Sequence, residues 1–248
     1  MKWSYLTTIG ILIGLWLFTV VIKVQPFLVP PPNLVVSVLW VEREVFLQHG
    51  IRTVSIGLVG YLVANGLGIA LAIAFYYVPW LEAFVNPWIV FITRIPFIVF
   101  SSIFVVVFRT TVVPQIIIVV LVTIFTIVAN VSEGLRSADP VLLDRMKVLH
   151  ASRLQVFRKV LWAAAKPYFI AAQLIAFTGM VIAMIVAEYQ YGSEGLGFLL
   201  LRGQQQYRMD KLYAVAIIVS GLSVGIYILI KAYQSYELKK RRIVTRGQ

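Results

Sequence analysis

The sequence predicts an all-α integral membrane protein with about six transmembrane helices and a cytoplasmic helix–turn–helix loop between spans four and five. Of its 248 residues, 60% are hydrophobic and only 13% are charged, whereas about 25% are charged in soluble domains. The hydrophobic residues gather in uncharged runs, and a helix needs roughly 20 apolar residues to cross the bilayer. A basic segment, residues 133–166, separates the fourth run from the fifth. We therefore expect a single transmembrane domain over residues 1–248.

The predicted spans follow the uncharged runs. They are residues 3–22, 53–81, 89–108, 110–132, 167–187 and 212–230. The first run is too long and too aromatic for a cleaved signal peptide, and no small-residue cleavage site follows it. The third span is the weakest, because Arg94 and Pro96 lie inside it. We expect Arg94 to lie near one membrane surface, with its side chain reaching the lipid headgroups.

The second run is rich in small residues, which let another helix approach closely in a membrane. They are Gly57, Gly60, Gly66 and Gly68. We expect this span to be packed on several sides.

The distribution of basic residues predicts the orientation. Residues 133–166 hold seven Lys and Arg against three acidic residues, and the tail 231–248 adds six more basic residues. Six spans place this loop, the tail and both termini on one side, which the positive-inside rule makes cytoplasmic. The excess of 22 basic over 10 acidic residues therefore requires no nucleic acid as a partner.

Two external segments are long enough to have structure of their own. Residues 24–52 open with Pro26 and Pro30-Pro31-Pro32 and then favour a short amphipathic helix from about residue 34 to 47. Residues 188–211 contain Gly192-Ser193-Glu194-Gly195-Leu196-Gly197, which cannot be regular helix throughout. This glycine-rich stretch is not a dinucleotide fingerprint, because it follows a membrane helix and its spacing is wrong.

The loop 133–166 is too long for a simple connection. Asp139 is placed to cap a helix that has Pro140 at its first position, and Ser152 to cap a second helix over residues 153–162. The first helix carries an apolar stripe at helical spacing, formed by Leu142, Leu143, Met146 and Leu149. This stripe packs either on the protein's own bundle or in the groove of a partner.

Several short motifs around this loop occur together in one order. They are Glu133-Gly134-Leu135, Asp139-Pro140, Ala151-Ser152, Gln155-Val156-Phe157-Arg158-Lys159-Val160, Ala164-Ala165 and Pro167-Tyr168. In this order they resemble the cytoplasmic signature of permease subunits of binding-protein-dependent ABC importers. The closer resemblance is to the branch that imports sulfonates, taurine, nitrate, bicarbonate and related small or heterocyclic solutes. Outside the loop it extends to Val29-Pro30-Pro31-Pro32, Arg94-Ile95-Pro96, Ala187-Glu188 and Gly195-Leu196-Gly197.

The resemblance implies the partners. Two permease subunits, identical or different, enclose a solute path in the lipid; an external binding protein delivers solute; and two cytoplasmic ATPase subunits bind ATP and Mg. The chain itself has no GxxxxGK[ST] motif, so we expect no ATPase activity and no cofactor in it. The implied setting is the inner (plasma) membrane of a prokaryote.

The resemblance also implies two groups of site residues. Those expected to couple to the ATPase are Asp139, Pro140, Leu142, Leu143, Asp144, Arg145, Met146, Leu149, His150, Ala151 and Ser152. Those expected to line the path or its gate are Arg94, Pro96 and Glu188. For Glu188, a hydrogen-bonded carboxylate at the membrane interface is the alternative to a gating role.

The loop departs from the family pattern at its turn. Where the family usually has Glu-Ala-Ala-x-x-x-Gly, this chain has Asp144-Arg145-Met146-Lys147-Val148-Leu149-His150. Three explanations stay open: the ATPase cleft has adjusted to these side chains, the chain is the less active half of a heterodimeric permease, or coupling to the ATPase is lost. We expect His150 to be helical, the alternative being the strained left-handed conformation that glycine adopts easily.

Rival functions lack the residues they need. A proton-coupled secondary transporter keeps ionisable residues in its spans, and here only Arg94 falls inside one. A channel needs a filter segment, which is not visible. The absence of cysteine, with only His49 and His150 as histidines, leaves no predicted metal site. A transporter or channel that is not coupled to ATP remains the alternative to an ABC permease.

Overall fold

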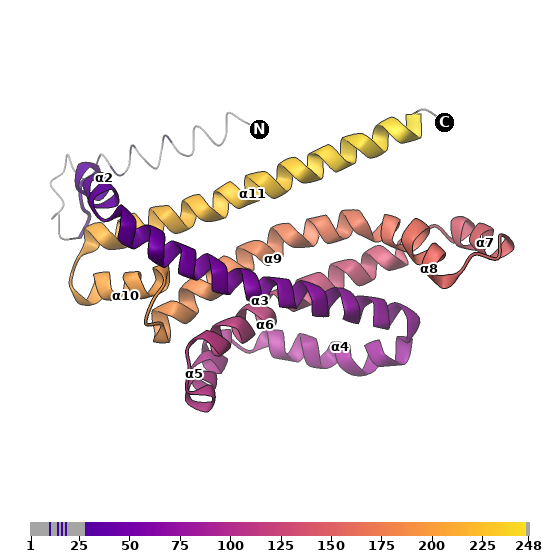
Figure 1. Ribbon diagram of the computed structural model, residues 1–248, viewed down its shortest axis with the longest axis horizontal. Helices are drawn as coiled ribbons and strands as arrows, with labels where there is room; N and C mark the ends of the chain where they lie inside the picture. Colours follow the sequence, from indigo (N-terminus) through magenta and orange to yellow (C-terminus); the bar gives the residue numbers. More distant parts are fainter. Residues whose placement is uncertain (1–9, 11–13, 15, 17, 19–27, 247–248) are drawn as a thin grey trace.

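A computed structural model describes residues 10, 14, 16, 18 and 28–246, and almost all of these are helical (Figure 1). Four long helices run along the length of the molecule: α3 (Arg43–Tyr77), α6 (Val112–Arg136), α9 (Trp162–Tyr191) and α11 (Met209–Arg246). The short helices α7 (Pro140–Val148) and α8 (Arg153–Val156) lie at one end. The helices α2 (Pro32–Val41) and α10 (Leu196–Gln205) lie at the other end.

Within the described residues, four helical segments are long and apolar enough to cross a membrane. They are Arg43–Tyr77, Val112–Arg136, Arg153–Tyr191 and Met209–Tyr236. A fifth span is possible if α4 (Pro79–Arg94) and α5 (Phe97–Phe108), which are bent by 94°, count as one. The first predicted span, residues 3–22, lies outside the described residues except at single positions.

The predicted span over residues 89–108 is not one continuous helix. Residues 89–94 end α4, and α5 begins only at Phe97. Between them Ile95 is extended, with φ −82° and ψ 128°, because a proline disfavours the helical conformation of the residue before it. Pro96 therefore turns the chain, and Arg94 lies at the bend.

Two further predicted boundaries are corrected. The external helix does not extend to residue 47, because it ends at Val41 and α3 begins at Arg43. The second loop helix is not separate from the fifth span, because α8, the π-helical turn η1 (Phe157–Leu161) and α9 follow without a gap. Together they form one helical segment of 39 residues, Arg153–Tyr191.

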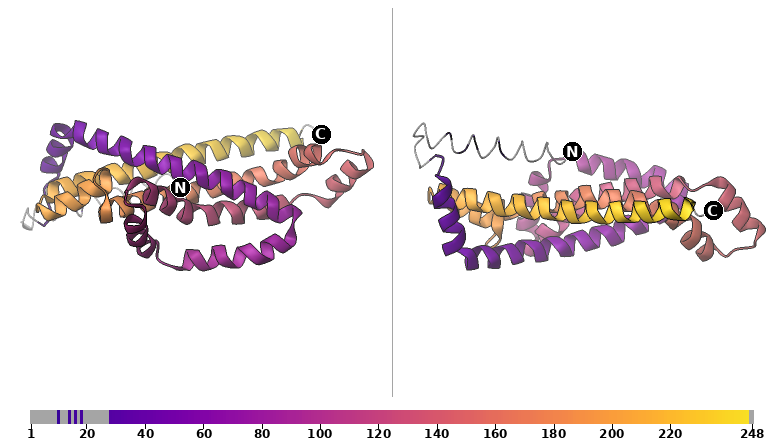
Figure 2. Two further views of the ribbon diagram at one scale, coloured as in Figure 1. Left: turned by 60° about the horizontal axis from the view of Figure 1, so that its bottom comes forward. Right: turned by 90° about the horizontal axis from the view of Figure 1, so that it is seen from above.

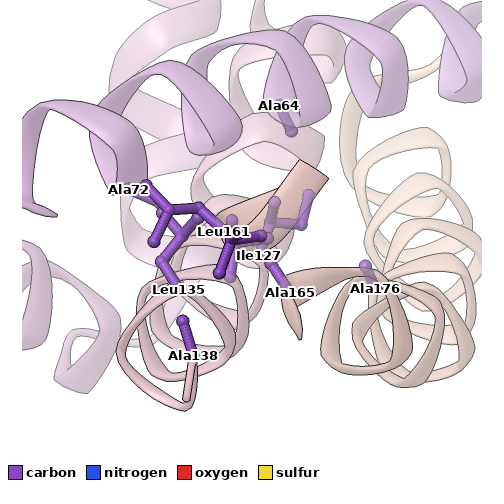
Figure 3. Packing of buried hydrophobic residues seen from close by; sticks show 10 residues of the cluster. Ala64, Ala72, Ile127, Leu135, Ala138, Leu161, Ala165 and Ala176 are labelled. Carbon is purple, nitrogen blue, oxygen red and sulfur yellow. The ribbon is translucent and has the colours of Figure 1, made fainter. Parts of the chain in front are cut away.

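The core lies where α6 packs between α3 and α9. Its buried cluster is built largely from small side chains, as Figure 3 shows: Ala64, Ala72, Ile127, Leu135, Ala138, Leu161, Ala165 and Ala176. Of the four glycines singled out in α3, Gly57, Gly60 and Gly68 face side chains of α6 or α9 at close range. Gly66 faces open space.

The arrangement places the two basic regions together. In both views of Figure 2, the C-terminal end of α11 lies toward the same end of the molecule as α7 and α8. The loop 133–166 and the described part of the basic tail therefore share one end, as the sequence predicts.

Gly134 offers a test of the α6–α9 contact. A Cβ atom there would lie 2.7 Å from the Cα of Ala165 and 2.9 Å from the Cβ of Tyr168. Because backbone cannot move aside cheaply, we expect Gly134→Ala to lower the free energy of unfolding by about 1–3 kcal/mol. Gly66→Ala is the matched control, since nothing lies within 4 Å of its added Cβ. Chemical unfolding of the purified permease in detergent measures both, and equal stability of the two variants would contradict the packing described.

Candidate functional site

The loop helix α7 begins as predicted. The Asp139 carboxylate accepts a hydrogen bond from the backbone N–H of Val141 at 2.8 Å, and Pro140 is the first helical residue. This cap satisfies one of the N–H groups that a helix start leaves free. The start of α7 is therefore fixed by its own sequence.

The end of α7 corrects the prediction for His150. This residue is left-handed, with φ 48°, and not helical. Its N–H donates to the Lys147 carbonyl at 2.9 Å, and the N–H of Ala151 donates to the Met146 carbonyl at 3.0 Å. These two bonds form a Schellman cap, in which glycine usually occupies the left-handed position. The good helix formers around His150 do not decide its conformation, because the chain must reverse here.

Ser152 caps the next helix, also as predicted. Its Oγ accepts from the N–H of Gln155 at 3.3 Å, and its own N–H donates to the Gln155 side-chain oxygen at 2.8 Å. This capping box places the cap of α8 at Ser152, two residues after His150, and α8 begins at Arg153. The turn between the helices is therefore held from both sides.

The predicted apolar stripe of α7 divides between two faces. Leu143 and Met146 pack against the protein's own buried cluster, whereas Leu142 and Leu149 are 43% and 74% exposed. Other exposed side chains extend what we call the outward face of α7: Val141, Leu142, Arg145, Val148 and Leu149. Their spacing places them on one side of a helix.

A charged pair lies off this face, with Lys147 on the opposite side of α7. Lys147 donates a hydrogen bond to Asp144 at 2.8 Å, and this bond raises the pKa of Lys147 above its ordinary value. Both side chains are well exposed, so the pair contributes little to stability.

Arg94 and Pro96 lie at the bend between α4 and α5. Both are exposed, and Arg94 has no ion-pair partner among the described residues. After this bend, α5 packs near α9. The hydroxyl of Ser101 on α5 donates a hydrogen bond to the side-chain oxygen of Gln190 on α9. This contact brings α5 close to the end of α9 that carries Glu188.

Glu188 is fully buried near the end of α9. Its Oε2 accepts from the hydroxyl of Thr53 at 2.8 Å and from the N–H of Gly197 at 3.0 Å. Thr53 in turn accepts from the N–H of Leu196 at 2.9 Å. Glu188 is thus a hydrogen-bonded carboxylate that is enclosed by protein and not at a free helix end, and its role in the path or gate stays a prediction.

Further contacts join the same segment to α3. The N–H of Gly195 donates to Nδ1 of His49 at 2.8 Å. Gly195 has φ 108°, which L side chains rarely adopt. At the rim, Arg52 pairs with Glu194 at 3.3 Å. One face of α3 thus binds the chain between α9 and α10.

The other end of α10 is held by charges. Lys211 pairs with Glu42 at 2.7 Å, and Arg208 lies 3.5 Å from Glu42 and 2.6 Å from Asp210. The hydrogen bond to Asp210 raises the pKa of Arg208 above its ordinary value. These ion pairs tie the start of α11 to the break between α2 and α3.

The predicted site residues therefore fall in three places: the α7 turn, the α4–α5 bend and the end of α9 that carries Glu188. Sequence reasoning identified Glu188 but missed its partner Thr53, which lies 135 residues away along the chain. The only sequence signal was the motif Gly195-Leu196-Gly197, which supplies the N–H donors. Among the described residues, no group of three or more His, Asp or Glu side chains is placed to hold a metal ion.

Comparison with known proteins identifies relatives along most of the chain. The family described as "Binding-protein-dependent transport system inner membrane component" matches residues 64–236. A "Probable ABC transporter permease protein" of Haemophilus influenzae is 26% identical over 91% of this chain and 92% of that protein. The formylaminopyrimidine transport permease protein ThiX of Halalkalibacterium halodurans is 27% identical over 88% of both chains. The putative aliphatic sulfonates transport permease protein SsuC of Bacillus subtilis is 24% identical over 64% of this chain and 58% of that protein.

A solved structure has a similar fold. An inward-facing MetNI methionine ABC transporter contains a chain that superimposes with a TM-score of 0.59. The similarity covers 80% of this chain and 96% of that chain at 19% sequence identity. At this identity the match indicates the fold alone.

The left-handed His150 gives a test of the loop geometry. We expect His150→Gly to stabilise the turn by about 1 kcal/mol, because glycine adopts a positive φ without strain. Val148→Gly is the control in the same helix, where glycine should instead cost a few tenths of a kcal/mol. Hydrogen exchange of the α7 amides measures both changes. Faster exchange in His150→Gly would show that the histidine is not strained.

Proposed function

The chain belongs to the family of inner membrane components of binding-protein-dependent transport systems, and we propose that it couples to a separate ATPase subunit through the outward face of α7. It is a permease component of ABC importers. Members of this family are not themselves ATPases. In the proposal, ATP and Mg are bound by that partner, and a second permease subunit completes the solute path.

The outward face of α7 carries this proposal. It presents four exposed apolar side chains around Arg145, and Val148 and Leu149 are each more than 70% exposed. An apolar helix face that projects beyond the membrane-crossing part of the bundle is suited to a hydrophobic groove on a partner. The inward residues Leu143 and Met146 hold the helix on the bundle, so a force on α7 is passed to α6 and α9.

The turn geometry favours an active coupling loop over the two alternatives of a less active subunit and lost coupling. His150 keeps the left-handed backbone that glycine would permit at this position, despite its strain. A loop that had lost its function would have no reason to retain a strained turn. We infer that the ATPase cleft has adjusted to the bulkier Arg145, whereas Met146 packs on the protein's own bundle.

The solute is delivered, in this proposal, by an external binding protein that also selects it. The named relatives carry formylaminopyrimidine and, putatively by name, aliphatic sulfonates, which are small polar molecules of different shape. Import of a small polar solute agrees with both. Sequencing the solute-binding protein that co-purifies with the complex would narrow the class further.

The docking proposal is tested by charge on the outward face. We expect Leu142→Asp or Leu149→Asp to weaken association with the ATPase by at least about 100-fold, or about 2.7 kcal/mol, because an unpaired carboxylate would enter an apolar groove. Lys147→Gln, on the opposite side of α7, is the matched control. Co-purification and ATP hydrolysis measure the effect at equal permease yield. An intact and active complex with both aspartates in place would refute docking through this face.

The proposed orientation puts α7 and both termini in the cytoplasm and the segment between α9 and α10 outside. The chain has no cysteine, so a thiol reagent can label only the cysteine that is introduced. We expect an impermeant thiol reagent to label Ser193→Cys in intact cells, and Lys147→Cys only after the membrane is opened, since both positions are exposed. The reverse labelling pattern would invert the topology.

A further inference from the structure

The outer ends of three helices meet at one buried group of residues, which we call the Glu188 node. It consists of Glu188 on α9, Thr53 and His49 on α3, and Gly195 and Gly197 at the start of α10. Three hydrogen bonds connect α3 and α9 to this start, and a fourth, from Thr53 to Glu188, joins α3 to α9; each is between 2.8 and 3.0 Å. Among residues 28–236, whose burial the structure describes, no other carboxylate is fully buried.

The node is costly to open. A buried carboxylate that loses its donors bears the full cost of desolvation, and so do buried N–H groups that lose their acceptors. Thr53 serves both sides, because its oxygen donates to Glu188 and accepts from Leu196. Loss of this one hydroxyl therefore leaves the Leu196 N–H without its acceptor and takes from Glu188 one of the two donors to its Oε2.

The node is also sterically closed. A Cβ atom on Gly195 would lie 2.1 Å from the carboxyl carbon of Glu188, and one on Gly197 would lie 2.2 Å from the carbonyl oxygen of Ile185. The start of α10 thus sits against α9 with no room for a side chain, and sliding of either helix would break the contact. The ion pairs of Glu42 with Arg208 and Lys211 hold the far end of α10 to the same region.

The α9 segment connects the node to the loop. Arg153–Tyr191 is one helical segment of 39 residues, about 58 Å long at 1.5 Å per residue. Its first residues follow the turn at His150, and Glu188 lies near its other end. A displacement of α7 therefore reaches the outer end of the molecule through one continuous element.

We infer that Glu188 and Thr53 are positioning residues that keep the outer ends of α3, α9 and α10 joined as one body throughout transport. Movement of α7 then displaces the segment between α9 and α10. In the other direction, an external protein that binds α10 displaces the loop that carries α7. The contrasting possibility is a latch that must open in each cycle. This inference rests on the proposed coupling of α7 to an ATPase.

The experiment uses the permease assembled with its ATPase in lipid nanodiscs. The readout is the ratio of ATP hydrolysis with the loaded solute-binding protein of the same system to hydrolysis without it. Thr53→Val removes the hydroxyl but keeps the shape, and Thr53→Ser restores the hydroxyl. For cross-linking, Arg52→Cys and Glu194→Cys place thiols at the exposed rim pair, and a short bifunctional thiol reagent joins α3 to the segment between α9 and α10.

We expect Thr53→Val to lower the stimulation ratio by at least about fivefold, and Thr53→Ser to keep it within about twofold. Basal hydrolysis should persist in both. The cross-link should leave the ratio unchanged in the otherwise unaltered protein and should restore most of it in Thr53→Val. A purely structural role would instead lower basal and stimulated hydrolysis together, in proportion to the folded protein.

Besides this proportional fall, two results would overturn the inference. One is an unchanged ratio in Thr53→Val. The other is loss of stimulation when the otherwise unaltered protein is cross-linked, since a latch must open and a permanent joint need not. This second measurement uses protein that retains Thr53, so it does not depend on whether Thr53→Val folds. Failure of the docking proposal is seen separately, as association with the ATPase that survives Leu149→Asp.

Discussion

The close approach of α6 to its neighbours is the constraint on which the rest of the structure depends. Helices in lipid gain little from burying apolar surface against each other, so their association rests on close van der Waals packing. Here alanines on α3 and α9 surround Ile127 and Leu135 of α6 (Figure 3), and Gly134 meets the backbone of α9. Because this contact lies just before the loop, it fixes where the chain leaves the bundle and hence where α7 is presented.

Much of the fold follows from hydropathy, but its boundaries do not. Hydropathy reports which residues suit lipid, and it located the long helices. It does not report where a helix starts outside the lipid, so the continuation of α9 back to Arg153 was not foreseen. The break at Ile95 depends on one proline in an apolar run, and a window average over the run hides that single residue.

The candidate sites divide in the same way. The caps at Asp139 and Ser152 are local interactions between neighbouring residues, so sequence alone predicts them. The conformation of His150 was mispredicted because helix propensity describes the chain locally, whereas the reversal of the chain decides the turn. The partners of Glu188 come from α3 and α10, and no pattern within one chain segment pairs residues so far apart.

The π-helical turn η1 has a consequence for how the loop is aimed. A π-helical turn holds one residue more than an α-helical turn, and each residue of an α-helix turns the chain by about 100°. The extra residue at Phe157–Leu161 therefore rotates α7 and α8 about the axis of α9, relative to an unbroken α-helix. The direction in which the outward face of α7 points thus depends on the rotation that this one inserted residue adds about the helix axis. A related chain that lacks this residue would keep the same apolar side chains on α7, but they would point in a different direction about the axis of α9.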